Sequence, residues 1–422
     1  MRKLMVATLT PIVFGIAACE DITEPGGDPV EVSWTDCPGF VLPTWFAVQD
    51  GEGAWQRVGF AGNAYTFTIS HGRGGIATYS GELGLSIYYM TTEEMQENLP
   101  SCSSARRNVG GSVTGYSSAD NVNVFLGFGG VNSTTIFGSE PPPQDFFHTD
   151  LAPTTTDLVA VRYQTIASGT TFDQFPSRVF INRSVTGTDA GLVDLSSSTA
   201  ASAPLLRDVN VANVALGEAI GVNSTLWTAS TSAVLASHLN DAANVSGSVI
   251  VPLWGLPSTR LVTGETQEMH IEAIKTTAST EDIRVVSELY NDVSDRTVNL
   301  GPALSGISFS GGTRPSMTYT VQPSYADWFA LGVRQVVSIG GAFGTTAIEV
   351  SMTKGYANTS AASVTVAIPN LSGVSQFQPE WGLSAGQTAT WTFLAVGGDP
   401  AALWQEKPVA YKAAARSQTF TP

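Results

Sequence analysis

Apolar and polar residues alternate along much of the chain, with the period of two that a half-buried β-strand requires. Clear examples are Ala64–Ile69, Met269–Ile274 and Thr388–Leu394. Turn-forming residues such as those in Lys354–Asn358 separate these segments. No segment keeps a period of 3.6 long enough to alternate helices with strands. The sequence therefore predicts an all-β fold made of several antiparallel β-sandwich modules in tandem.

One short helix is expected near 92-99. The stretch Thr91–Glu94 reads as a capping box, and Pro100 would end the helix. Glu93, Glu94 and Glu97 fall in its first turns, where carboxylates complement the helix dipole. We therefore expect these glutamates to be structural.

Changes in composition and strand spacing divide the chain into six expected parts. They are a signal peptide (1-18), a flexible tether (19-29), a disulfide-tied β-rich module (30-105), a β-sandwich (106-240), a further β module (241-310) and a final β-sandwich (311-422). The tether follows from the acidic, Pro- and Gly-containing stretch Glu20–Pro29. A shared N-V-x-G-S-V phrase at Asn108–Val113 and Asn244–Val249 suggests repeated module starts.

The most apolar stretch is the N-terminus, where Arg2 and Lys3 precede the 15-residue run Leu4–Ala18. That length suits a signal peptide and is short of the roughly 20 residues that a spanning helix needs. Ile16-Ala17-Ala18-Cys19 resembles the lipobox of bacterial lipoproteins. The resemblance implies cleavage before Cys19, acylation of that cysteine with palmitate-like chains, and a location in the cell envelope, facing the periplasm or the exterior. Ordinary secretory cleavage and an uncleaved anchor are the alternatives.

The composition fits an exported β-protein and argues against nucleic-acid binding. Charged residues are only 13%, against about 25% in typical soluble domains. The net charge is −16, and loss of Arg2 and Lys3 with the signal peptide makes it −18. Such a surface repels phosphate backbones and anionic lipid headgroups. The N-terminal lipid is therefore the expected membrane attachment, and solubility is the simplest role of the charge.

The chain has three cysteines, Cys19, Cys37 and Cys102. If Cys19 carries lipid, one pair remains in an oxidising compartment, and we expect a Cys37–Cys102 disulfide. Its loop of roughly 65 residues would contribute about 4 kcal/mol to stability. Two buried free thiols are the alternative.

The sequence contains no convincing match to a known catalytic or cofactor-binding motif. Gly72–Ala77 matches the dinucleotide fingerprint G-x-G-x-x-A, but strand and turn residues follow it where a helix is needed. The histidines His71, His148, His238 and His270 are far apart in sequence. We therefore expect no catalytic residue, no cofactor and no metal site. Asp292 and Asp295 are weak calcium candidates, since Asn291–Asp295 lacks the D-x-D-x-D-G spacing.

Two sets of aromatic residues could contact a ligand. A Pro-rich segment, Ser139–His148, leads to Phe146 and Phe147, which would form a partner-binding loop if exposed; burial in the next strand is favoured. Eight of the nine tryptophans could include sugar-stacking platforms, although most are expected in cores. They are Trp45, Trp55, Trp227, Trp254, Trp328, Trp381, Trp391 and Trp404.

Two parts of the chain resemble known β-sandwich domains. The opening Asn108–Val113 and the later strand Asp157–Arg162 resemble the seven-stranded, prealbumin-like domains attached to many exported proteins. The strand spacing after residue 311, with Tyr319 early and Trp391 late, resembles a fibronectin type III or immunoglobulin-like domain. Neither resemblance implies a particular ligand.

These features predict a lipid-anchored cell-envelope protein with a non-enzymatic binding or scaffolding role, one version being an accessory subunit of a membrane complex. Its partner would be an envelope protein or a glycan. The alternative is a carbohydrate-binding or polysaccharide- or peptide-hydrolysing surface lipoprotein, whose site would be built from dispersed carboxylates.

Overall fold

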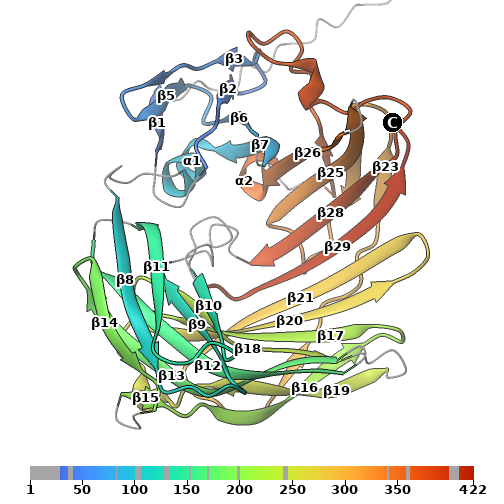
Figure 1. Cartoon of the computed structure of the whole chain (residues 1–422). Coiled ribbons are helices and arrows are strands. Elements are labelled where there is room, and N and C mark those ends of the chain that lie inside the picture. Colours follow the sequence, from blue (N-terminus) through green and yellow to red (C-terminus); the bar gives the residue numbers. More distant parts are fainter. Residues whose placement is uncertain are drawn as a thin grey trace, which may run out of the picture.

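The computed structural model describes residues 29–36, 41–81, 83–99, 106–127, 133–151, 154–168, 171–196, 200–240, 246–339, 342–357, 362–398 and 408–422. The predicted all-β architecture is confirmed, with strands throughout and helices confined to short segments (Figure 1). The predicted signal peptide and the three cysteines, Cys19, Cys37 and Cys102, lie outside the described residues. Within the described ranges, no helix has the length and apolarity needed to cross a membrane.

Four sandwiches repeat one strand order. In each, the first and fourth strands pair in a small sheet, and the third, second, fifth and sixth strands follow one another in a larger sheet. The first sandwich contains β1 (Val30–Thr35), β2 (Trp45–Asp50), β3 (Gln56–Arg57), β4 (Phe60–Ala61), β5 (Ala64–Ile69), β6 (Arg73–Ser80), β7 (Gly84–Thr91) and α1 (Thr92–Asn98). The short strand β4 adds to the small sheet beside β5.

The second and third sandwiches each add a seventh strand, which pairs in parallel with the first. The second contains β8 (Arg107–Thr114), β9 (Asn121–Leu126), β10 (Ser133–Phe137), β11 (Gln144–Leu151), β12 (Thr156–Ser168), β13 (Thr171–Val185), β14 (Asp189–Asp194) and β15 (Ala201–Ser202). The third contains β16 (Leu205–Val214), β17 (Ala219–Trp227), β18 (Ser232–Asn240), β19 (Gly247–Gly255), the 3₁₀ turn η1 (Ser258–Arg260), β20 (Thr266–Thr276), β21 (Thr280–Tyr290) and β22 (Arg296–Asn299).

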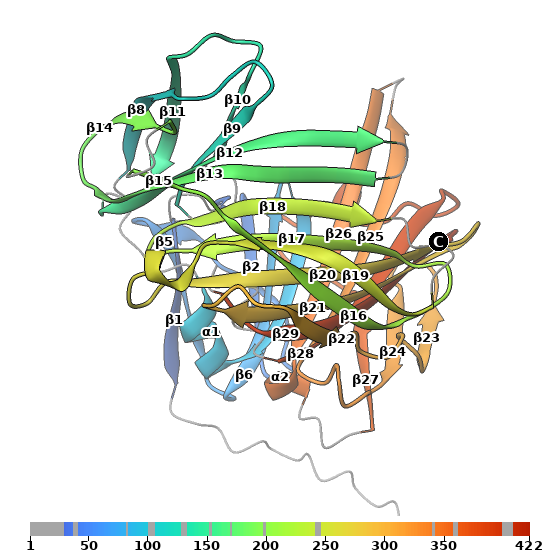
Figure 2. The same cartoon turned by 90° about the horizontal axis from the view of Figure 1, so that it is seen from below.

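The fourth sandwich has no described seventh strand after its sixth; an extra strand at its start pairs antiparallel with the next one. It contains β23 (Ile307–Ser310), β24 (Ser316–Thr320), β25 (Trp328–Ile339), β26 (Ala342–Thr353), α2 (Lys354–Ala357), β27 (Ser363–Ala367), the 3₁₀ turn η2 (Pro379–Trp381), β28 (Ala389–Gly398) and β29 (Tyr411–Phe420). Small sheets thus lie on the large one as a second layer, as Figure 2 shows for β16 and β19 over β17 and β20.

The larger sheets of all four sandwiches join edge to edge into one central sheet. Its strand order is β10–β9–β12–β13–β18–β17–β20–β21–β29–β28–β25–β26–β7–β6–β2–β3. The joins are β13 with β18 and β21 with β29, both antiparallel, and β26 with β7, which is parallel. The sheet curves strongly, so that the first sandwich lies beside the fourth (Figure 1).

The strand pairings refine the expected division of the chain. β16 pairs with β19 and β17 pairs with β20, across the expected boundary at residue 240. The segment from β16 to β18 therefore belongs to the third sandwich. The N-V-x-G-S-V phrase was a misleading sign of repetition, because Asn108–Val113 lies in a first strand and Ser246–Val249 leads into a fourth strand.

The predicted helix is present as α1, with the predicted capping box. The Thr91 hydroxyl accepts from the Glu94 backbone N–H (3.2 Å), and the Glu94 carboxylate accepts from the Thr91 N–H (2.7 Å). Glu94 also accepts from the Thr353 hydroxyl at 2.6 Å. The helix start is thereby tied to the end of β26, in the fourth sandwich.

Three strands of the first sandwich are buried on both faces. On β2, the side chains of Phe46 and Val48 face the core under β1 and β5, while Trp45 and Ala47 enter the core of the fourth sandwich. β6 and β7 share these two cores. This explains the unbroken apolar run from Trp45 to Val48, because a strand covered on both sides has no solvent face to keep polar.

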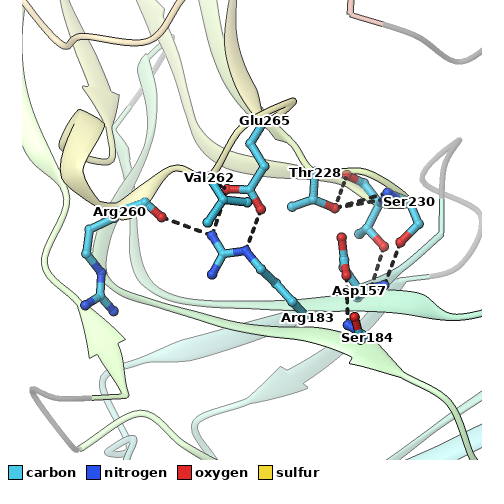
Figure 3. A network of polar contacts seen from close by, with 9 residues as sticks. Asp157, Arg183, Ser184, Thr228, Ser230, Arg260, Val262 and Glu265 are labelled. Atoms are coloured by element: carbon cyan, nitrogen blue, oxygen red, sulfur yellow. Dashed lines mark hydrogen bonds and ion pairs between the residues drawn. The ribbon is translucent and has the colours of Figure 1, made fainter.

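A polar network fixes the second sandwich against the third (Figure 3). Arg183 of β13 donates from Nε and Nη2 to both oxygens of Glu265, at 2.6 and 2.7 Å. Glu265 is 5% exposed and also accepts from the Val262 N–H. Asp157 of β12 accepts from the Ser184 N–H at 2.9 Å, and its own N–H donates to the Ser230 hydroxyl at 2.7 Å. The Arg183–Glu265 bonds are charge-assisted, and the Glu265 side chain is buried, so they help to fix the orientation of the two sandwiches.

A buried ion pair connects the third sandwich to the start of the fourth. Arg284 of β21 and Glu218 are 5% and 4% exposed, and Arg284 Nε lies 2.9 Å from Glu218 Oε1. Arg284 also donates to the carbonyl oxygens of Asn213 (2.9 Å) and Gly301 (2.7 Å). Gly301 precedes β23, so one guanidinium on β21 joins the turn between β16 and β17 to the link between two sandwiches.

We predict that Glu218→Gln lowers the free energy of unfolding by about 3 kcal/mol, because it leaves a buried guanidinium without its counter-charge. Urea denaturation followed by fluorescence measures the change. Asp282→Asn is the matched control, since it removes a half-exposed partner from Arg416 and should cost less than about 1 kcal/mol. Equal losses in the two variants would contradict the role given to the buried pair.

Candidate functional site

The concave face of the central sheet carries polar and charged groups that line a groove. This face lies opposite the small sheets of the third and fourth sandwiches (Figure 1). Directly opposed residues form one polar row across six strands: Glu281, Ser417, Thr392, Gly332, Glu349 and Ser86. The hydroxyls of Thr392 and Ser417 lie 2.8 Å apart.

A groove of about 380 Å³ lies over this row in the fourth sandwich. Its lining includes Leu83, Arg334, Glu349, Thr390, Thr392 and Leu394. Gly332 forms part of the floor on β25, and a Cβ added there would meet nothing closer than the Thr392 carbonyl oxygen at 3.8 Å. The absent side chain therefore leaves the groove open. Mixed apolar, hydroxyl and charged lining is the usual composition of a small-ligand or peptide site.

Glu349 is the unusual ionisable group of this groove. Burial raises the pKa of its carboxyl above the ordinary 4.5, against the opposing effects of Ser351 and Arg334. Burial, together with the neighbouring Glu349 charge, also raises the pKa of Tyr88 to about 12. The hydrogen bond from Ser351 and the charge of Arg334, on the neighbouring strand, therefore do not fully offset the desolvation of the Glu349 carboxylate.

A second polar set lies on the same face, in the third sandwich. Glu268 accepts from Trp227 Nε1 at 2.7 Å and lies 2.5 Å from the Ser287 hydroxyl. His270 Nδ1 lies 3.2 Å from the Tyr411 hydroxyl. Burial lowers the pKa of His270, and burial raises the pKa of Tyr411 to about 12. At neutral pH both side chains are uncharged, and they form a hydrogen-bonded pair.

An apolar patch lies between the two polar sets. Trp328, Val285, Val396 and Ala413 pack together on the concave face between the groove and the His270 pair. Tyr411 borders this patch on one side and Leu394 on the other. The four patch residues are all buried, so this patch separates the two polar sets and is not itself open to a ligand.

The paired phenylalanines lie in strand β11, but only one of them is buried, whereas the sequence favours burial of both. Phe146 is 3% exposed in the core of the second sandwich, whereas Phe147 is 62% exposed on the opposite face of β11. The difference follows from the alternation of side chains along a strand. One phenylalanine is thus available to a partner.

The calcium candidates do not converge. Asp292 and Asp295 are both exposed; the Asp292 carbonyl oxygen accepts from Arg296, and Asp295 Oδ1 accepts from the Asp208 N–H at 3.0 Å. Across the described ranges, no three His, Cys, Asp or Glu side chains gather as metal ligands.

The Gly-rich stretch Gly72–Ala77 leads into the β6–β7 hairpin, as the sequence predicted. Its glycines permit close packing: a Cβ on Gly74 would lie 2.3 Å from the Gln49 carbonyl oxygen. A G-x-S-x-G match at Gly382–Gly386, missed by the sequence analysis, lies in a loop before β28 and not in a strand-to-helix turn. There the Ser384 backbone is held by the Gln335 amide.

The tryptophans are divided between cores and partly exposed positions. Trp45, Trp328 and Trp391 are buried; Trp55, Trp227, Trp254 and Trp381 are partly exposed; Trp404 lies outside the described residues. Of these, Trp227 contacts the polar set on the concave face and Trp381 lines a separate groove.

Sequence comparisons do not assign the chain to a family. No protein-family model matches it, and no curated protein matches it significantly. The geometry of the concave face therefore supplies the functional argument.

We predict that Glu349→Gln raises Tm at pH 8 only slightly, by about 1 °C or less, because the residue is exposed and solvent screens its charge. The folded state raises the pKa of Glu349 and therefore favours its protonated carboxyl. The wild-type protein has this stability in full below the ordinary pKa of 4.5 and loses it as the pH rises through the folded-state pKa, whereas glutamine does not ionise. The gain should therefore shrink towards pH 4. Thermal unfolding at several pH values measures the gain, and a gain independent of pH would contradict a raised pKa at Glu349.

Proposed function

We propose that the protein is a non-enzymatic, lipid-anchored binding protein of the bacterial cell envelope, which holds a partner segment in the groove over Gly332. The groove is the observation that carries this proposal. It combines an open floor with Arg334, Glu349, hydroxyls and two leucines, a set suited to an extended peptide segment. The fused central sheet gives the groove rigid walls, because β25, β26 and β28 all pair within it.

The location rests on the N-terminus. Ile16–Cys19 resembles a lipobox, Arg2 and Lys3 precede a run of signal-peptide length, and an acidic tether follows. Acyl chains on Cys19 would hold the body at the envelope, with the expected Cys37–Cys102 disulfide stabilising the first sandwich. An accessory subunit of a membrane complex is the version that best matches a protein-binding groove.

The alternative is a polysaccharide- or peptide-hydrolysing lipoprotein. The polar set around His270 favours it, since Glu268 and Glu272 face the same side of β20. Four residues along a strand separate their Cα atoms by about 13 Å. A pair of glycosidase carboxylates lies about 5–9.5 Å apart. The backbone spacing therefore argues for binding over glycoside hydrolysis.

We predict that Cys19→Ser abolishes fatty-acid labelling and releases the protein from membranes, because the acylated atom is the cysteine sulfur. Metabolic labelling with palmitate and fractionation measure both effects. Membrane retention of the variant without label would instead indicate an uncleaved anchor.

We predict that Gly332→Val removes a stoichiometric partner from the protein purified after mild solubilisation, because the new side chain fills the groove floor. The gel-filtration profile and subunit stoichiometry of the purified complex measure this. The free energy of unfolding should change little, since a Cβ at this position has room.

Gly221→Val is the matched control. Gly221 lies on β17, and a Cβ there would also meet nothing closer than 3.9 Å. This variant should keep the partner. A wild-type protein that purifies alone, or a Gly332→Val protein that keeps its partner, would contradict the proposal.

A further inference from the structure

A second groove lies where the first sandwich meets the fourth. It has a volume of about 520 Å³ and is lined by Thr44, Trp45, Gln376, Phe377, Gln378 and Trp381. None of these residues is charged. They belong to the approach and start of β2 and to the loop that contains η2, so neither sandwich forms the groove alone.

Aromatic rings form a rigid wall of this groove. Trp381 stacks on Tyr79 with ring centroids 4.1 Å apart and an interplanar angle of 10°. Trp45 and Phe377 meet Trp381 edge-on at 5.7 and 5.5 Å. Trp45 is 1% exposed and donates from Nε1 to the Ser375 carbonyl oxygen at 3.1 Å, which ties the loop to β2. Trp381 itself remains partly exposed.

The same groove is also lined by polar amide side chains. Gln376 and Gln378 are exposed, and within the described part of the chain neither side-chain amide has a hydrogen-bond partner. Gln376 has a backbone φ of +63°, a left-handed conformation that is costly for a residue other than glycine. A strained residue that places a free amide beside an aromatic wall is typical of a binding site.

We infer that this groove binds a neutral sugar chain. A pyranose ring with equatorial hydroxyls has an apolar C–H face that packs on an aromatic ring, and a polar rim. The amides of Gln376 and Gln378 can both donate to and accept from that rim. The Thr44 hydroxyl donates to the Tyr79 carbonyl oxygen at 3.2 Å and can accept from the rim. The uncharged lining selects against phosphorylated or acidic chains. The inference adds a glycan contact to the proposed envelope function, at a site separate from the Gly332 groove.

The test titrates the full chain, in a zwitterionic detergent without a sugar head group, with cellohexaose, laminarihexaose and N-acetylchitohexaose. Calorimetry should show saturable binding of at least one of them. Gln376→Gly should weaken that binding about fivefold, the effect of one lost hydrogen bond. The same variant should raise Tm, because glycine adopts the positive φ without strain.

Trp381→Ala should abolish binding, whereas Trp254→Ala should not, since Trp254 is a partly exposed tryptophan of the third sandwich that contacts Phe175. If Trp381→Ala does not fold, Gln376→Gly and Gln378→Ala decide the question. Failure of all three sugars to bind, or unchanged affinity in the glutamine variants, would overturn the inference. Gly332→Val should bind sugar normally; weakened sugar binding in that variant alone would place the glycan in the other groove, leaving the binding function intact.

Discussion

The structure depends on backbone hydrogen bonding at the edges of its four larger sheets. An unpaired edge strand is a site of unwanted association, and here β13 pairs with β18, β21 with β29, and β26 with β7. Each pairing removes two edges and makes one sheet from separate sandwiches. The parallel join of β26 to β7 also brings the first sandwich against the last, although more than 200 residues separate them in the chain. The groove over Gly332 and the groove at Trp381 both combine residues of the first and fourth sandwiches, which these joins bring together.

Charged residues have two distinct roles in this structure. Arg183–Glu265 and Arg284–Glu218 are satisfied pairs at the junctions, where fixed geometry offsets the cost of desolvation. Glu349, in contrast, faces a groove, is exposed, and has a raised pKa because Ser351 and Arg334 do not offset the partial desolvation of its carboxyl. That difference separates the residues that hold the sandwiches together from those available to a ligand. It is also the reason that the groove, and not the junctions, carries the proposed function.

The two grooves have complementary chemistry. The groove over Gly332 is charged and is lined mainly by the fourth sandwich, with Leu83 of the first, whereas the groove at Trp381 is aromatic and uncharged and is shared by the same two sandwiches. A protein fixed at the envelope by its N-terminus could therefore contact a protein partner and a glycan through different surfaces. The exposed Phe147 adds an apolar contact on the second sandwich.

The sequence by itself determined the local elements. Alternation predicted the strands, Thr91–Glu94 predicted α1, and the residues after Gly72 predicted a hairpin, because these depend on neighbours in the chain. Only the tertiary structure decided how the sandwiches join, since edge pairing between distant strands leaves no local signal. The two copies of the short N-V-x-G-S-V sequence, for example, belong to strands that are not equivalent: a first strand and a fourth strand. His270 and Tyr411 likewise meet only because β21 pairs with both β20 and β29, and Tyr79 and Trp381 because the first sandwich packs on the fourth; 141 and 302 residues separate these pairs in the chain.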